Sequence, residues 1–331
     1  MKKYMAICLA AAIVISTCLT GCAGAPKENN SGKLQIVTTI FPAYDWVRSV
    51  LGDNPAGVEA SFLLDSGVDL HSFQPSAEDI LKISTCDLFI YVGGESDAWI
   101  DDVLESAPDD LVVINLLDVL GDSVKEEEVV EGMQAEEEHE HGEDGDAEEE
   151  EEETEYDEHV WLSLRNAKTL VGSISDAIQK LDPANAATYQ SNTEAYLAKL
   201  QDLDNAYADA VNAGSVKTLL FGDRFPFRYL VDDYGLLYYA AFVGCSAETE
   251  ASFETITFLA GKVDELNLPV VLTIEDSDRR LAETIIETAQ KKDLPILTLD
   301  SMQATTAEQA QSTTYLSVME GNLSVLKEAL Q

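Results

Sequence analysis

Histidines are the side chains of this 331-residue chain best suited to hold a metal ion, and there are four of them. His71 lies in the segment 69–76 (DLHSFQPS) and His159 in the segment 156–162 (YDEHVWL), neither of which has the periodicity of a helix or strand. Zinc prefers imidazole nitrogen and thiolate ligands, and carboxylate is an acceptable partner. A lone histidine is more often structural or simply exposed, so this pair indicates a metal site without establishing one.

Acidic side chains follow predicted strands in the second half of the chain. Asp223 comes after the apolar run 216–221, and Glu275 and Asp278 come after the run 269–274. In open parallel sheets, ligands bind beyond the carboxyl ends of the strands. These carboxylates are therefore candidates for a binding site.

The charge balance narrows the class of partner. A net charge of −42 results from 62 acidic and 20 basic residues. This argues against nucleic acid, whose phosphates need Lys and Arg, and makes cations the natural partners.

Nearly half of this net charge lies between residues 126 and 158, where twenty of thirty-three residues are Asp or Glu and none is Lys or Arg. Such a segment cannot bury enough apolar surface to offset its ordering entropy, so we expect a solvated, disordered loop. It also holds His139 and His141. These two could collect ions loosely, or the segment could be only a solvated run of charge.

The N-terminus is typical of a secretory signal. Two lysines precede an apolar run over 4–15 that is too short to span a membrane, and Leu-Thr-Gly-Cys follows at 19–22. The last four residues resemble a bacterial lipobox, which implies that residues 1–21 are removed and that Cys22 is acylated. The alternative is an ordinary signal peptide with an incidental cysteine. We expect residues 22–33 to be a flexible tether and the chain to be lipid-anchored at the outer face of the cytoplasmic membrane, in the cell envelope.

Cys86 and Cys245 are the cysteines that remain in the expected mature chain. In an oxidising compartment such a pair can form a disulfide. The alternative is two separately buried small side chains. Their wide separation in the sequence leaves the choice open.

The pattern of elements predicts an α/β protein, because short β-branched runs alternate with helical patterns in both halves. Expected strands are 34–40, 58–64, 87–92, 111–116, 216–221, 236–242, 269–274 and 296–299. Expected helices are 45–51, 77–84, 98–106, 248–267, 279–292 and 306–330.

Two further helices are expected between these halves. Apolar residues recur at spacings of three and four over 164–181, and a second helix restarts at Asp182-Pro183 and runs to about Val211. Thirty helical residues reach about 45 Å, long enough to tie two lobes together. We therefore expect an N-terminal lobe (34–182), a rigid linker helix (183–212) and a C-terminal lobe (213–331), each lobe with a mainly parallel sheet flanked by helices.

Several of these motifs together resemble a known family, the metal-binding solute-binding lipoproteins of zinc and manganese ABC transporters. They are the lipobox, HSFQPS at 71–76, the acidic histidine-bearing segment, DEHVWL at 157–162, YGL at 234–236 and SAETEAS at 246–252. The likeness covers essentially the whole mature chain. It implies two α/β lobes, joined by one long helix, that hold a single ion at their interface with two ligands from each lobe.

The resemblance also implies a ligand set. His71 and His159 match the first two ligands, and Asp223 stands where the family usually has histidine or glutamate. Asp278 fits the fourth position best, with Glu275 as the fallback. Other roles remain open, since Asp223 could pair with Arg224 or a neighbouring arginine (Arg228), and Asp278 could cap the following helix.

The function that the resemblance implies is capture of a transition-metal ion and its delivery to an ABC importer permease by a monomeric, non-enzymatic carrier. Two imidazoles and two carboxylates suit zinc, while the harder oxygen donors also accommodate manganese or iron. One rival is a secreted metallohydrolase, although no His-Glu-x-x-His helix or Gly-x-Ser-x-Gly turn supports it. The other is an adhesin that uses the acidic segment.

Overall fold

The computed structural model describes residues 33–134, 155–246 and 250–331. The expected signal peptide, Cys22, His139 and His141 lie outside these residues. Residues 34–331 form one compact unit. Among the helices described, none combines the length and the apolar character needed to cross a membrane.

The first lobe is built on a four-stranded parallel sheet in the order β2-β1-β3-β4. The strands are β1 (Gln35–Thr38), β2 (Glu59–Phe62), β3 (Leu88–Tyr91) and β4 (Val112–Asn115). Its helices are α2 (Phe41–Leu51), α3 (Ala77–Thr85), α4 (Trp99–Leu104) and α5 (Leu116–Leu120). Every residue of β3 is buried, as its uninterrupted apolar sequence requires for a strand covered on both faces.

The second lobe repeats this arrangement with the order β6-β5-β7-β8, again all parallel. The strands are β5 (Thr218–Phe225), β6 (Leu237–Val243), β7 (Val271–Thr273) and β8 (Ile296–Thr298). Its helices are α8 (Arg228–Tyr234), α9 (Phe253–Glu265) and α10 (Arg280–Thr288). The predicted class, two α/β lobes with parallel sheets, is confirmed.

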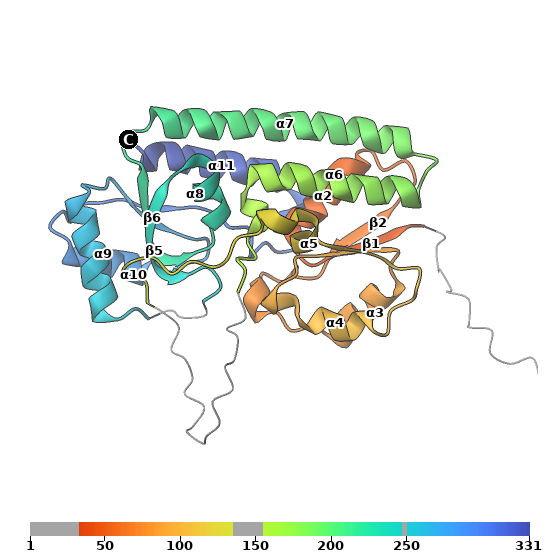
Figure 1. Ribbon diagram of the computed structural model, residues 1–331, viewed down its shortest axis with the longest axis horizontal. Coiled ribbons are helices and arrows are strands. Elements are labelled where there is room, and N and C mark those ends of the chain that lie inside the picture. The colour runs from red at the N-terminus through yellow and green to blue at the C-terminus, as the bar shows by residue number, and fades with distance from the viewer. Residues whose placement is uncertain (1–32, 135–154, 247–249) are drawn as a thin grey trace, which may run out of the picture. The chain divides into compact units, whose positions relative to one another are not determined.

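After the first sheet, α6 (Leu164–Leu181) packs on the first lobe against α2 and α5. It is followed by α7 (Ala186–Ala213), which Figure 1 shows running along both sheets. The helix begins at Ala186 rather than at the predicted Pro183. The reason is local, since the Asp182 carboxylate accepts hydrogen bonds from the Asn185 and Tyr189 side chains and holds residues 182–185 in a turn. The buried side chains of α7 follow helical spacing along one stripe: Tyr189, Thr193, Tyr196, Leu200, Leu203 and Tyr207.

A second helix spans both lobes. The C-terminal helix predicted over 306–330 begins only at Tyr315, as α11 (Tyr315–Ala329), and it begins against the first lobe. There Asp45 of α2 accepts a hydrogen bond from the Tyr315 backbone N–H, at 2.9 Å. At its other end the Leu330 carbonyl accepts from Ser215, before the second sheet. Thus α11 joins α7 in fixing the two lobes together (Figure 1).

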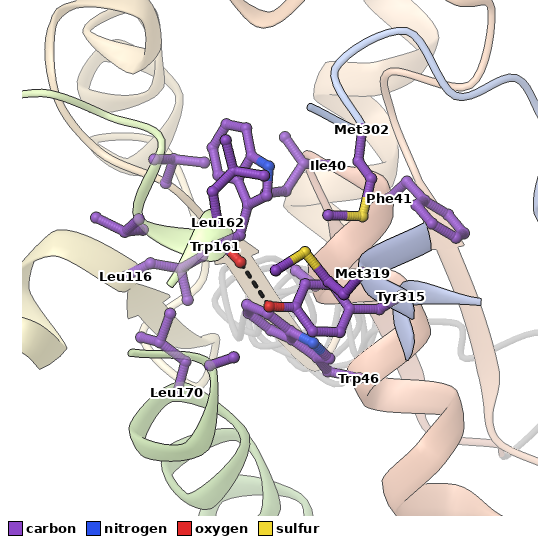
Figure 2. Close-up of a cluster of buried hydrophobic side chains, with 14 of the residues drawn as sticks. Ile40, Phe41, Trp46, Leu116, Trp161, Leu162, Leu170, Met302, Tyr315 and Met319 are labelled. Atoms are coloured by element: carbon purple, nitrogen blue, oxygen red, sulfur yellow. Dashed lines mark hydrogen bonds between the residues drawn. The ribbon is translucent and has the colours of Figure 1, made fainter. Parts of the chain in front are cut away.

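A buried aromatic cluster packs where these elements meet (Figure 2). Trp46 of α2 and Tyr315 of α11 pack edge-to-face with ring centroids 5.2 Å apart. The Tyr315 hydroxyl donates to the Trp161 carbonyl at 2.7 Å, and the Trp161 indole donates to the Ser301 carbonyl at 2.8 Å. The cluster therefore fixes the segment that begins at His159 between the two lobes.

The two described ends of the acidic segment are ordered, which differs from the predicted disorder over 126–158. Glu126 and Tyr156 form an antiparallel bridge, and the Gln134 N–H donates to the Ala241 carbonyl on β6 at 2.9 Å. The few apolar residues here explain the difference, because Val130 and Met133 pack against the core. Composition averaged over thirty-three residues concealed these anchoring side chains.

Candidate metal site

His71 lies in a single 3-10 turn (Leu70–Ser72) that follows the second strand of the first lobe. Asp69 caps this turn and accepts a hydrogen bond from the His71 N–H at 2.9 Å. The ring Nδ1 lies 2.7 Å from the Ser96 hydroxyl and 3.5 Å from Glu158 Oε2. These oxygens leave Nε2 as the nitrogen that faces the interior.

His159 is fully buried at the start of another 3-10 turn (Val160–Leu162). Asp157 Oδ1 lies 2.8 Å from the backbone nitrogen of His159 and 3.0 Å from its Nδ1. A carboxylate in that position fixes the tautomer with the proton on Nδ1 and increases the basicity of Nε2. Two adjacent acids thus serve the two rings, Asp157 for His159 and Glu158 for His71.

The two Nε2 atoms lie 3.1 Å apart, although the residues are 88 positions apart in sequence. Two zinc–nitrogen bonds of about 2.0–2.1 Å at a tetrahedral angle place their nitrogens about 3.3 Å apart. When both rings carry their proton on Nδ1, directed at these oxygens, the facing Nε2 atoms present lone pairs to each other. A cation between them would turn this repulsion into coordination.

Gln303 brings a third electron-pair donor from the second half of the chain. Its side-chain oxygen lies 3.2 Å from His159 Nε2. Its amide nitrogen donates to the Ser301 hydroxyl at 3.0 Å, and that hydroxyl in turn donates to Glu275. This chain of donors orients the amide so that its oxygen, rather than its nitrogen, faces the histidines.

Cys245 lies two residues beyond the end of β6, close to the two histidine rings. Within the described residues, His71, His159 and Cys245 form a group whose ligand atoms all lie within 4.8 Å of one another. Gly244 makes this approach sterically feasible, since a Cβ there would lie 2.9 Å from His159 Cε1 and 2.9 Å from the Phe225 carbonyl oxygen.

The expected alternative of a Cys86–Cys245 disulfide is not what the structure contains. Cys86 is buried at the end of α3, where its thiol donates to the Ile83 carbonyl. Cys245 instead faces the histidines. Its place directly after a strand was the one signal in the sequence that could have suggested a ligand, and Gln303 had none.

The acids expected as third and fourth ligands have other partners. Asp223 accepts from the backbone of Arg224 at 2.9 Å and of Ile274 at 3.4 Å. Asp278 is exposed, accepts from the Arg280 N–H and pairs with the Arg280 side chain at 3.2 Å. Asp278 is not the cap of α10, because Arg279 holds the N-cap position and no side-chain cap hydrogen bond is formed there.

Glu275, the fallback for the fourth ligand, contacts Gln303 and Ser301. Its carboxylate accepts from the backbone N–H groups of Ser301 and Gln303 and from the Ser301 hydroxyl, at 2.6–3.0 Å. It therefore positions Gln303. Glu275 and Gln303 also line a cavity of about 470 Å³ beside the site, together with Asp69, Asp223 and Asp278.

The arginine of the GDRF segment crosses between the lobes. The Arg224 guanidinium makes an ion pair and a hydrogen bond with Asp69, two residues before His71. The alternative pairing of Asp223 with Arg228 is also not formed, because Arg228 pairs with Glu128 and Asp232. The Arg224–Asp69 pair thus closes one side of the site.

The electrostatics follow from burial and from neighbouring charges. Burial, together with the neighbouring His159, lowers the pKa of His71 to about 3. Burial opposes protonation of His159 as well, but the Asp157 carboxylate outweighs it and raises the pKa of His159. Burial, with Glu127 beside the thiol, raises the pKa of Cys245.

Comparison with known proteins identifies similar chains. The family model described as zinc-uptake complex component A, periplasmic, matches residues 36–329. The chain is 32% identical over 328 residues to the zinc-binding lipoprotein AdcA of Streptococcus pneumoniae, covering 99% of this chain and 61% of that protein. It is 30% identical over 332 residues to the high-affinity zinc uptake system protein ZnuA of Bacillus subtilis, covering 99% and 98%.

A similar solved structure is the Zn(II)-bound ZnuA-like domain of Streptococcus pneumoniae AdcA. It superposes with a TM-score of 0.67 at 30% identity, over 90% of this chain and 99% of that domain. The present chain therefore spans about three fifths of the full streptococcal protein but nearly all of its ZnuA-like domain.

Proposed function

This chain belongs to the family of periplasmic zinc-uptake component A, and from that premise we propose that it captures one zinc ion between its lobes and delivers it to an ABC importer. Zinc is the cargo rather than a resident cofactor. The relatives named for zinc binding and high-affinity zinc uptake support this choice.

The observation that carries the proposal is the pair of histidine Nε2 atoms 3.1 Å apart. Each ring has its other nitrogen directed at an oxygen, with a buried carboxylate beside it, as is usual for histidines that bind a metal. His71 and His159 are therefore the proposed first two ligands. The acids Asp223, Asp278 and Glu275 line the adjacent cavity and attract the cation towards it.

The identity of the metal follows from the imidazole pair. Imidazole suits zinc, whereas manganese favours carboxylate, carbonyl and water. Manganese or iron remains the alternative cargo, and competition among the three ions for the purified protein would rank them.

Release of the ion is proposed to occur by local movement around the site. Because α7 and α11 both span the lobes, a wide hinge motion would disrupt two packed helices. Opening the Arg224–Asp69 pair would instead free the turn that carries His71. The importer is the partner that would drive this step, and a lipid anchor on Cys22 would hold the carrier beside it at the outer face of the membrane.

Elemental analysis of the purified chain tests the function. We expect about one zinc per chain, the occupancy of a single closed four-ligand site. The double variant His71→Ala, His159→Ala should lose it, and the matched control His139→Ala, His141→Ala should keep it. Zinc retained by the first variant, or lost only by the second, would refute the proposed site.

Deletion of residues 135–154 separates the carrier from the adhesin alternative. The deletion spares the anchored ends of the acidic segment, including the Gln134–Ala241 hydrogen bond. A carrier should keep its tightly bound zinc. Loss of that zinc with a folded protein would instead place the metal function in the acidic segment.

A further inference from the structure

We propose that a sulfur ligand, the Cys245 thiolate, is the third ligand of the zinc ion beside the two histidines. The side-chain oxygen of Gln303 is the fourth. This inference rests on the proposed function and replaces the carboxylates expected from the sequence. The set would be two nitrogens from the first lobe with one sulfur and one oxygen from the second half of the chain.

The position of Cys245 is the first support. Its sulfur is the atom that forms a compact group with the two imidazoles, all within 4.8 Å of one another. Its backbone N–H donates to Glu127 at 3.2 Å, which ties the residue to the anchored start of the acidic segment. Gly244 lets this turn lie directly against the His159 ring. The backbone is thus shaped to bring the thiol to the histidines.

The partners of the acids are the second support. Glu275 already accepts three hydrogen bonds from the 301–303 segment. Asp223 accepts two backbone N–H groups, and Asp278 is exposed beside Arg280. Recruiting any of them as a ligand would break contacts that hold the loops of the second lobe. Recruiting Cys245 requires the loss of its thiol proton, which burial and the neighbouring Glu127 oppose, but it leaves these contacts of the acids intact.

Gln303 is the third support. The residue is buried, and its oxygen is directed at His159 Nε2, 3.2 Å away. Both atoms are electron-pair donors when the His159 proton is on Nδ1, so their approach lacks a hydrogen between them. A cation satisfies all of these lone pairs at once, whereas a buried polar atom without a partner costs free energy.

Zinc binding in this site releases one proton, from the Cys245 thiol. The Cys245 S–H bond breaks, the electron pair stays on sulfur and forms the bond to zinc, and the proton leaves to water. No oxidant or reductant takes part. A thiolate ligand favours zinc over manganese, because soft sulfur donors select against hard cations.

Cobalt(II) substitution provides the test, since cobalt bound to thiolate absorbs intensely in the near ultraviolet and cobalt bound only to nitrogen and oxygen does not. The full-length protein is stripped with a chelator and titrated with Co(II). We expect the thiolate band in the parent and in the control Cys86→Ser, and its loss in Cys245→Ser. Cys86 is a suitable control because it is buried in the first lobe at the end of α3.

The outcomes separate the two proposals. Co(II) bound by the parent without the thiolate band would overturn the sulfur ligand while leaving zinc capture intact. No binding of Co(II) or zinc by the parent would overturn the proposed function itself. The parent spectrum decides the question even if Cys245→Ser fails to fold.

Gln303 is tested separately by its effect on zinc affinity. Gln303→Leu should weaken zinc binding about 10–100-fold, the range also seen when the partners of ligands are removed. The control Gln190→Leu, on the exposed face of α7, should bind as the parent does. An unchanged affinity in Gln303→Leu would remove Gln303 from the ligand set.

Discussion

The two lobes share one sheet order but contribute to the site in different ways. The first lobe supplies two imidazoles whose rings are already held by Asp157, Ser96 and Glu158. The second half of the chain supplies a thiol and a neutral amide, while its carboxylates are used to fix loops. One side is therefore organised before the ion arrives, and the other decides which ion is preferred.

In the proposed site, orientation and metal preference are therefore set by different residues. Orientation is set by buried carboxylate–imidazole contacts, which tolerate little change. Selectivity depends on the softness of the remaining donors, which one substitution can alter. We call His71, His159 and the residues that orient them the organised side, and Cys245 and Gln303 the selective side. The following variants alter one side or the other, in order of decreasing expected effect.

Trp161→Ala should break the organised side most severely. Removing a fully buried tryptophan costs about 3–5 kcal/mol of stability, and here it also frees the segment that carries His159. Thermal or urea unfolding of the metal-free protein measures the loss. The half-buried Trp99 on α4 is the control, and Trp99→Ala should cost clearly less. Equal losses of stability in the two variants would show that the aromatic cluster around Trp161 does not stabilise the site more than other parts of the first lobe do.

Asp97→Asn should reduce the pH dependence of the stability of the metal-free protein. Asp97 lies next to Ser96 and accepts from the N–H groups of Val92 and Gly93, and burial raises its pKa to about 7. A raised carboxyl pKa means that the folded state binds more protons between about pH 4 and 7. The metal-free protein should therefore lose stability as pH rises through this window, by at most about 1.4 kcal/mol per pH unit.

In the Asp97→Asn variant this slope should flatten, because the amide stays neutral and its oxygen can still accept both N–H groups. Urea midpoints measured at several pH values give the slope. A slope that is the same in both proteins would assign the pH dependence to another group.

Asp157→Ala should weaken zinc binding about 10–100-fold, as expected when the carboxylate that orients a ligand histidine is removed. Competition with a zinc-chelating dye measures the affinity. Asp278→Asn is the control, because Asp278 is exposed beside Arg280 and should have no effect. A large loss in Asp278→Asn would instead support the ligand set expected from the sequence.

Cys245→Asp should change selectivity more than stability. A carboxylate in place of the thiol should lower the preference for zinc over manganese by about tenfold, through the loss of the soft donor. Paired titrations with zinc and manganese measure the ratio. A ratio unchanged from the parent would mean that Cys245 does not contact the ion.

Much of the architecture followed from local patterns. All eight strands of the two sheets overlap the predicted runs. Buried strands such as β3 and β7 carry the continuous apolar sequence that marks a parallel strand covered on both faces. The short helices α5 and α8 were missed, since five and seven residues are too few to display a helical period.

Residue types and short spacings were enough to predict the class of fold, the two histidines and the acidic character. The surroundings of the histidines, in contrast, depend on how distant segments pack. Cys245 and Gln303 meet them through strand order and loop packing across more than 80 residues, and no local period encodes such contacts. The acids that looked available in the sequence proved to be engaged by neighbouring backbone, because N–H groups left unpaired at strand and helix ends must find acceptors.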